Sequence, residues 1–143
     1  MHRRKLLIGI FGAVLTASCD DSSLKPADDV RQRLIGRWLE EISDGGFQSR
    51  SVVTLDRNGT FIEVEEALKA NELTMQQTHA GEWSFDGVNF KRKYTNLNGK
   101  NLSNASFGYA TYAIKFLGED SFIGIDNVRE REYRFSRIEA IVR

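Results

Sequence analysis

Cysteine, proline and histidine are all scarce in this 143-residue chain. Cys19 is the single cysteine and cannot form a disulfide within the chain, which excludes a disulfide-stabilised scaffold. Of the two histidines, only His79 lies beyond the N-terminal segment. No second histidine, cysteine or tight carboxylate group stands at metal-ligand spacing from it, so we expect no protein-only zinc site and no cofactor.

Neither sign of charge is in excess, because 20 Lys and Arg are matched by 20 Asp and Glu. Nucleic-acid-binding proteins normally carry a basic excess or a basic stripe, so no nucleic-acid partner is expected. Hydrophobic residues make up 41% of the chain and charged residues 28%, which is typical of a globular protein and excludes a disordered one. The length predicts one domain.

A long hydrophobic run is also missing. Leu6 to Leu15 is uncharged but only ten residues long, and it follows the basic residues Arg3, Arg4 and Lys5. Ten helical residues cover about 15 Å, half of the roughly 30 Å hydrocarbon core of a bilayer, so a spanning helix is not predicted. A basic start, a short apolar run and small residues after it are typical of a secretory signal.

The residues "LTASC" (15–19) resemble the lipobox of bacterial lipoproteins, with Thr16 where that family prefers an aliphatic residue. The resemblance implies that residues 1–18 are a signal peptide and that the Cys19 thiol carries diacylglycerol. Acyl chains would then anchor the protein in a membrane of the bacterial cell envelope, on its periplasmic face. Asp20 resembles an inner-membrane retention signal. The alternative is an ordinary signal peptide that leaves a free thiol, with Asp20 a solvated residue.

Residues 19–29 are polar and predict a flexible tether, which leaves 30–143 as the folded domain. Asp28 or Asp29 is a suitable cap for a short helix that places Val30 and Leu34 on one side.

The folded domain reads as an all-β antiparallel meander. Asn58-Gly59 and Asp86-Gly87 are hairpin turn signals. Residues 67–74 have a composition that predicts a short helix or a long loop, and 95–106 predicts a polar loop. Such a meander closes into an up-and-down barrel or stays an open curved sheet. The predicted strands are 34–42, 48–56, 60–66, 75–85, 88–94, 107–117, 121–127 and 130–141.

Three motifs in order resemble lipocalins and related calycin barrels: Gly36-Arg37-Trp38, "GEWSFDG" (81–87) and "YRFSRI" (133–138). Physically, Gly36 permits a bend where the barrel closes, and Trp38 is large enough to cap the core. The resemblance implies that an arginine of the last strand stacks over Trp38. Arg137 is our choice for it, and Arg134 is the other possibility.

Few residues suggest catalytic chemistry, so we expect no enzymatic activity. No nucleophile elbow and no phosphate-binding glycine loop occur in the sequence. His79 is expected to be a structural or surface residue. The glutamates 63, 65 and 66 predict a solvated acidic edge, and residues 91–93 predict a solvated basic stretch. Arg92 nevertheless alternates in phase with Phe90 and Tyr94.

Two functions fit these features. The first is a membrane-anchored, lipocalin-like binding protein for a small apolar ligand. The second is an envelope protein-interaction module, such as an inhibitor, immunity or accessory lipoprotein, with a filled barrel and recognition by the connections 67–74 and 95–106. For the first function the candidate lining is aromatic, with Trp83 at either the core or the cavity wall: Phe61, Trp83, Phe90, Tyr94, Tyr112 and Phe122.

Overall fold

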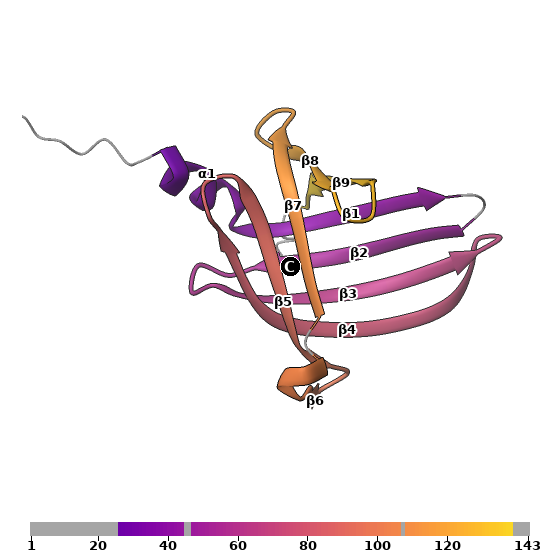
Figure 1. The fold of residues 1–143 in the computed structure, drawn as a ribbon. Coiled ribbons are helices and arrows are strands. Elements are labelled where there is room, and N and C mark those ends of the chain that lie inside the picture. The colour runs from indigo at the N-terminus through magenta and orange to yellow at the C-terminus, as the bar shows by residue number, and fades with distance from the viewer. Residues whose placement is uncertain (1–25, 45–46, 107, 139–143) are drawn as a thin grey trace, which may run out of the picture.

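The computed structural model describes residues 26–44, 47–106 and 108–138 (Figure 1). The predicted signal peptide, Cys19 and most of the predicted tether therefore lie outside the described residues. One helix, α1 (Pro26–Leu34), precedes the strands. The strands are β1 (Gly36–Asp44), β2 (Phe47–Leu55), β3 (Thr60–Lys69), β4 (Glu72–Phe85), β5 (Asn89–Leu97), β6 (Lys100–Asn101), β7 (Gly108–Phe116), β8 (Ser121–Asp126) and β9 (Arg131–Arg137), with a 3-10 turn η1 (Asn104–Ser106).

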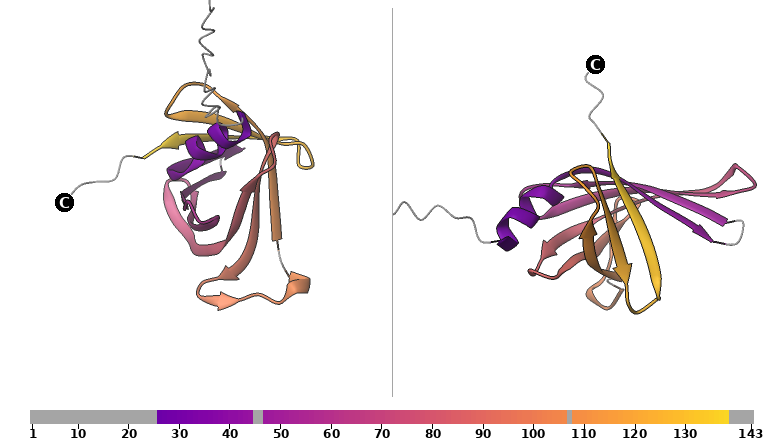
Figure 2. Two further views of the ribbon diagram at one scale, coloured as in Figure 1. Left: turned by 90° about the vertical axis from the view of Figure 1, so that its left-hand side faces the viewer. Right: turned by 90° about the horizontal axis from the view of Figure 1, so that it is seen from above.

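The strands form a closed antiparallel barrel, which confirms the predicted fold class and matches a lipocalin-like barrel. The sheet order is β4-β3-β2-β1-β9-β8-β7-β5-β6, and pairing of β4 with β5 closes the ring. Eight strands make up the barrel, because β6 pairs only with the end of β5. Figure 2 shows the long β3–β4 hairpin extending beyond the shorter strands β7 to β9.

The prediction of a helix or long loop at 67–74 was wrong. β3 and β4 continue through this segment and are joined at Ala70 and Asn71, both with positive φ (52° and 64°). Two consecutive left-handed residues make a tight hairpin turn whose twist matches that of the strands. Cross-strand pairing thus overrides the helical preference of the local composition.

The predicted polar loop at 95–106 is also shorter than expected. β5 runs to Leu97, and Asn98 and Gly99 form a second turn with positive φ that leads into β6. Asn-Gly is the turn signal that marks hairpins elsewhere in this chain. The remaining connection contains η1 and lies at the end of the barrel away from α1 (Figure 1).

Helix α1 begins at Pro26, within the segment predicted to be tether. Proline suits the first turn of a helix, where its missing N–H would have no partner. Asp28 and Asp29 lie in the first turn, where carboxylates are favoured by the helix dipole. The α1 end of the barrel faces the viewer in the left-hand view of Figure 2. Leu34, the last helical residue, is fully buried in the core.

Gly36, Trp38 and Arg137 together close this end of the barrel, and we call it the closed end. The Arg137 guanidinium lies 4.2 Å from the Trp38 ring centroid, so the stacking expected of Arg137 is present. Its Nη1 and Nη2 donate to the carbonyls of Ile35 and Arg33, which lie at the end of α1. Gly36 has φ of 131°, and a Cβ there would come within 2.7 Å of Arg137 Nη1.

Aromatic rings fill the closed end. Phe122 stacks on Phe135 at a centroid distance of 4.3 Å and meets the edge of Trp38 at 4.8 Å. Phe90 contacts both phenylalanines and is fully buried. Trp38 Nε1 donates to the Leu34 carbonyl at 2.8 Å, so its one polar atom has a partner in the core.

Candidate functional site: a polar cavity at the open end

The side chains that point into the barrel change from apolar to polar along the strands. In β3, Phe61 and Glu63 are both buried, whereas Ile62 between them is half exposed. In β5, Phe90 is followed two residues later by buried Arg92. Since alternate residues of a strand share a face, each pair belongs to one inward row. Inward rows in β1 and β2 change in the same way, from Trp38 to Glu40 and from Val53 to Ser51.

Arg92 is the centre of a buried charged cluster. Its Nη2 lies 2.9 Å from Glu40 Oε2 and donates to the Tyr112 hydroxyl at 2.8 Å. Its Nη1 lies 3.3 Å from Glu63 Oε2. The three charged side chains come from β1, β3 and β5, so only closure of the barrel brings them together.

The hydrogen bonding of this cluster is incomplete. Glu63 Oε2, Arg92 Nε and Arg92 Nη1 are buried without a hydrogen-bond partner, although Nη1 and Oε2 are within ion-pair distance. Buried polar atoms nearly always have partners in folded proteins, and those that lack one commonly mark a functional site. The cluster therefore holds polar atoms whose hydrogen bonding the protein itself does not complete.

Burial and neighbouring charge shift the protonation of the cluster. Removal from water raises the pKa of Glu40 to about 7, with Arg92 opposing the shift and Glu63 adding to it. Burial disfavours the charge on Arg92, but Glu40 and Glu63 outweigh it and hold the Arg92 pKa well above its usual value. The guanidinium is thus permanently charged, while Glu40 exchanges its proton near neutral pH.

A second polar group lies beside the cluster. Glu65 Oε2 is 3.2 Å from His79 Nε2, and its Oε1 accepts from the Ser49 hydroxyl at 3.3 Å. The His79 ring meets the Tyr94 ring edge-on at 5.4 Å. His79 therefore faces the interior of the barrel and lines a cavity there.

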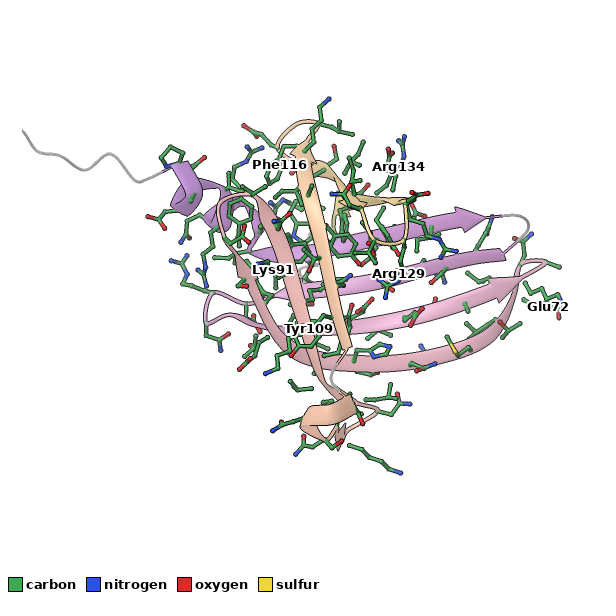
Figure 3. The ribbon with its side chains drawn as sticks, in the orientation of Figure 1. Glu72, Lys91, Tyr109, Phe116, Arg129 and Arg134 are labelled. Atoms are coloured by element: carbon green, nitrogen blue, oxygen red, sulfur yellow. The ribbon has the colours of Figure 1, made fainter. Side chains whose placement is uncertain are left out.

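A cavity of about 680 Å³ occupies this polar half of the barrel, which we call the open end. Its deep wall is formed by buried residues, among them Glu40, Glu63 and Arg92. Its rim includes the exposed residues Tyr109 and Arg129, both labelled in Figure 3. The volume lies within the range of about 300–1,000 Å³ usual for small-molecule sites.

The six candidate lining residues separate between the two ends. Tyr94 and Tyr112 line the cavity. Phe61, Phe90 and Phe122 lie in the aromatic core and are absent from its lining. Trp83 is also a core residue, and its Nε1 donates to the Asp56 carbonyl at 2.8 Å. It lines a second cavity of about 560 Å³ together with Arg31 and Lys91.

Two predictions about charged residues were wrong. Glu63 of the acidic edge is 5% exposed, and Arg92 of the basic stretch is 1% exposed. Both point inward because they share the inward row with a phenylalanine two residues earlier. That phase was the available signal: Arg92 alternates with Phe90, and Glu63 with Phe61. Glu66, by contrast, pairs with Arg50 at 2.7 Å and is partly exposed.

The described part of the chain contains neither a group of metal ligands nor a helix that could span a membrane. No group of three or more His, Cys, Asp or Glu side chains there is placed to hold a metal ion. Within the same residues, none of the helical structure has the length and hydrophobicity needed to cross a bilayer. No protein-family model and no curated protein matches this chain.

Proposed function

We propose that this chain is a lipid-anchored binding protein of the bacterial envelope that holds a small molecule in the open end of its lipocalin-like barrel. The observation that carries the proposal is the cavity of about 680 Å³ in a barrel whose other end is packed with aromatic side chains. Because the closed end is packed, a ligand would enter and leave by the open end. This arrangement suits binding better than passage.

In this proposal the ligand carries polar groups, unlike the apolar ligand expected from the sequence. A purely apolar molecule would offer no hydrogen bonds to the charged and polar groups of the cavity wall. An unpaired buried polar group costs about 1–3 kcal/mol, which would weaken binding. The tyrosines of the wall, Tyr94 and Tyr112, provide apolar surface beside these groups.

The anchor at Cys19 sets the orientation of the barrel in this proposal. Six residues separate Cys19 from Pro26, the first residue of α1, and the seven Cα–Cα steps span at most about 25 Å when extended. Since α1 lies at the closed end, that end would face the membrane. The open mouth would then face the periplasm, where a polar ligand is dissolved.

Binding is tested with a matched pair of glycine variants. Gly108 belongs to the cavity lining, and a Cβ added there meets only Tyr94 at an ordinary 3.8 Å. Gly108→Trp therefore obstructs the cavity with little strain. Gly118→Trp is the control, because an added Cβ there has no atom within 4 Å and Gly118 is not in the lining.

The readout is ligand-observed NMR on the full chain in a mild non-ionic detergent. Fragments are neutral, cationic and anionic single-ring compounds at millimolar concentration. We expect at least one class to bind the original chain and Gly118→Trp, and to lose binding in Gly108→Trp. If no fragment binds the original chain more strongly than it binds Gly108→Trp, the proposed binding function is wrong.

Anchoring is tested separately by Cys19→Ala. We expect the original chain in the membrane fraction of a bacterial host and the variant in the soluble fraction, because acyl chains supply the attachment. A variant that stays in the membrane fraction contradicts the anchor.

A further inference from the structure

We propose that the cavity recognises a small organic cation, a protonated primary amine, through Glu63 and Glu65. This assignment rests on the proposed binding function and specifies its ligand. It follows from the charges of the deep wall, from a carboxylate oxygen there that accepts no hydrogen bond, and from the tyrosine rings beside it.

The deep part of the cavity has more negative than positive charge. Glu40, Glu63 and Glu65 face one guanidinium, that of Arg92. The other arginines of the lining, Arg129 and Arg131, are exposed rim residues. The Arg129 Nη1 is already 2.7 Å from Asp126 Oδ2. A ligand that reaches the deep wall therefore meets a surplus of carboxylates, which favours a cation.

Glu63 shows where the charge of that ligand is needed. Its side chain is 7% exposed, it lines the cavity, and its Oε2 has no hydrogen bond. Its nearest cationic group is Arg92 Nη1 at 3.3 Å, and because a carboxylate oxygen can only accept, any further partner must be a donor. A primary ammonium offers three N–H donors and a full positive charge, which gives the shorter and stronger kind of hydrogen bond.

Glu65 and two tyrosines complete the surroundings. Glu65 stands two residues after Glu63 on β3, in the same inward row, and adds negative charge to the cavity while its two oxygens contact Ser49 and His79. The Arg92 guanidinium already lies 5.6 Å from the Tyr94 ring and 5.3 Å from the Tyr112 ring. Aromatic rings at this distance stabilise cations, and Tyr94 and Tyr112 also line the cavity in which a ligand cation would lie.

Other charged ligands fit less well. An anion would approach Arg92 but would also meet three carboxylates, two of which are within ion-pair distance of that guanidinium. A metal ion needs several ligands at short range, and the described residues contain no such group of three. An amine needs only one or two carboxylates and accepts a looser geometry.

The test uses three probes that share one ring and differ at one end: tyramine, its neutral alcohol tyrosol, and the anion 4-hydroxyphenylacetate. Binding to the full chain is measured by isothermal titration calorimetry above about pH 7, where Glu40 is ionised. We expect tyramine to bind at least tenfold more tightly than either of the others, because only its ammonium group can form charge-assisted hydrogen bonds with a carboxylate.

Variants locate the binding group. Glu63→Gln keeps the shape and removes the charge, and it should weaken tyramine binding about tenfold or more without changing tyrosol binding. Glu66→Gln is the matched control, since Glu66 lies on the same strand and pairs outward with Arg50; it should leave both affinities unchanged. If circular dichroism shows that Glu63→Gln is unfolded, Glu65→Gln, whose side chain is 29% exposed, takes its place with the same expected loss.

Several results would overturn the assignment. Binding of tyrosol or 4-hydroxyphenylacetate as tight as that of tyramine would show that charge is not recognised. Equal tyramine affinity in Glu63→Gln and Glu66→Gln would place the cation elsewhere. Failure of all three probes would also refute the amine, while the comparison of Gly108→Trp with Gly118→Trp decides independently whether the cavity binds any ligand.

Discussion

The two ends of this barrel are built by the same strands and have opposite chemistry. At the closed end, Trp38, Phe122 and Phe135 pack ring against ring, and Arg137 lies over Trp38. At the open end, Glu40 and Arg92 are just as deeply buried, but their polar groups surround a cavity. Burial alone therefore does not distinguish a packed core from a candidate binding site. The chemistry of the buried groups does.

The difference also separates stability from function. Apolar side chains gain free energy on leaving water, so the closed end stabilises the fold. Buried charges lose their hydration energy, and only ion pairs and hydrogen bonds within the protein offset that loss. The open end therefore contributes little net stability.

The largest effect is expected at the closed end. Phe122→Ala removes a ring that contacts Trp38, Phe90 and Phe135, and should lower the free energy of unfolding by about 3–5 kcal/mol in urea denaturation. Leu117→Ala is the control, because Leu117 is 54% exposed and should change the stability by less than about 0.5 kcal/mol. A loss below about 1 kcal/mol for Phe122→Ala would show that this end is not a tightly packed core.

A smaller effect, dependent on pH, is expected at the open end. The folded-state pKa of Glu40 is about 7 against an ordinary 4.5, so between these values the folded protein binds the extra proton. Its contribution to stability is complete below pH 4.5 and is lost as the pH rises through 7. Denaturation at a series of pH values should show a decline of about 3 kcal/mol that is absent from Glu40→Gln.

The control for this titration is Glu41→Gln, which changes the exposed neighbour of Glu40. That variant should keep the decline. Identical pH profiles for Glu40→Gln and the original chain would mean that Glu40 titrates normally, and the electrostatic contrast between the two ends would be wrong.

The smallest effect concerns the charged residue of the closed end. Arg137→Met keeps an apolar stem over Trp38 but removes the cation and the hydrogen bonds to Arg33 and Ile35. We expect a loss of about 1–2 kcal/mol in the free energy of unfolding. Arg134→Met serves as the control, because the Arg134 side chain is 71% exposed. Equal losses for the two variants would contradict a special role for Arg137.

Much of the fold was predictable from local patterns. The hairpin signals at Asn58-Gly59 and Asp86-Gly87 and the alternating apolar residues mark strands that the structure contains. The hairpin at Ala70 and Asn71 was not predicted, because its residues prefer a helix locally and only pairing between β3 and β4 favours the turn. Local composition contains no information about the stabilisation gained by pairing with another strand.

The candidate site was much less predictable than the fold. Tyr94 and Tyr112 were among the expected lining residues and do face the cavity. Glu40 was not considered, and Glu63 and Arg92 were predicted to be solvated. Charged residues are usually on the surface, so the prediction followed their residue type rather than their position in the alternating pattern of the strand. The phase was the better guide, because an inward row stays inward as far as the pairing continues.

The sequence by itself determined most of the strands and the turns at Asn58-Gly59 and Asp86-Gly87, because these depend on backbone preferences and short-range patterns. Its resemblance to calycin barrels indicated the closure residues Gly36, Trp38 and Arg137. The tertiary structure alone decided that Glu40, Glu63 and Arg92 meet. They stand on three strands, 52 residues apart at most, and only the pairings that close the barrel place them around one guanidinium. Their burial, the raised pKa of Glu40 and the cavity all follow from that closure.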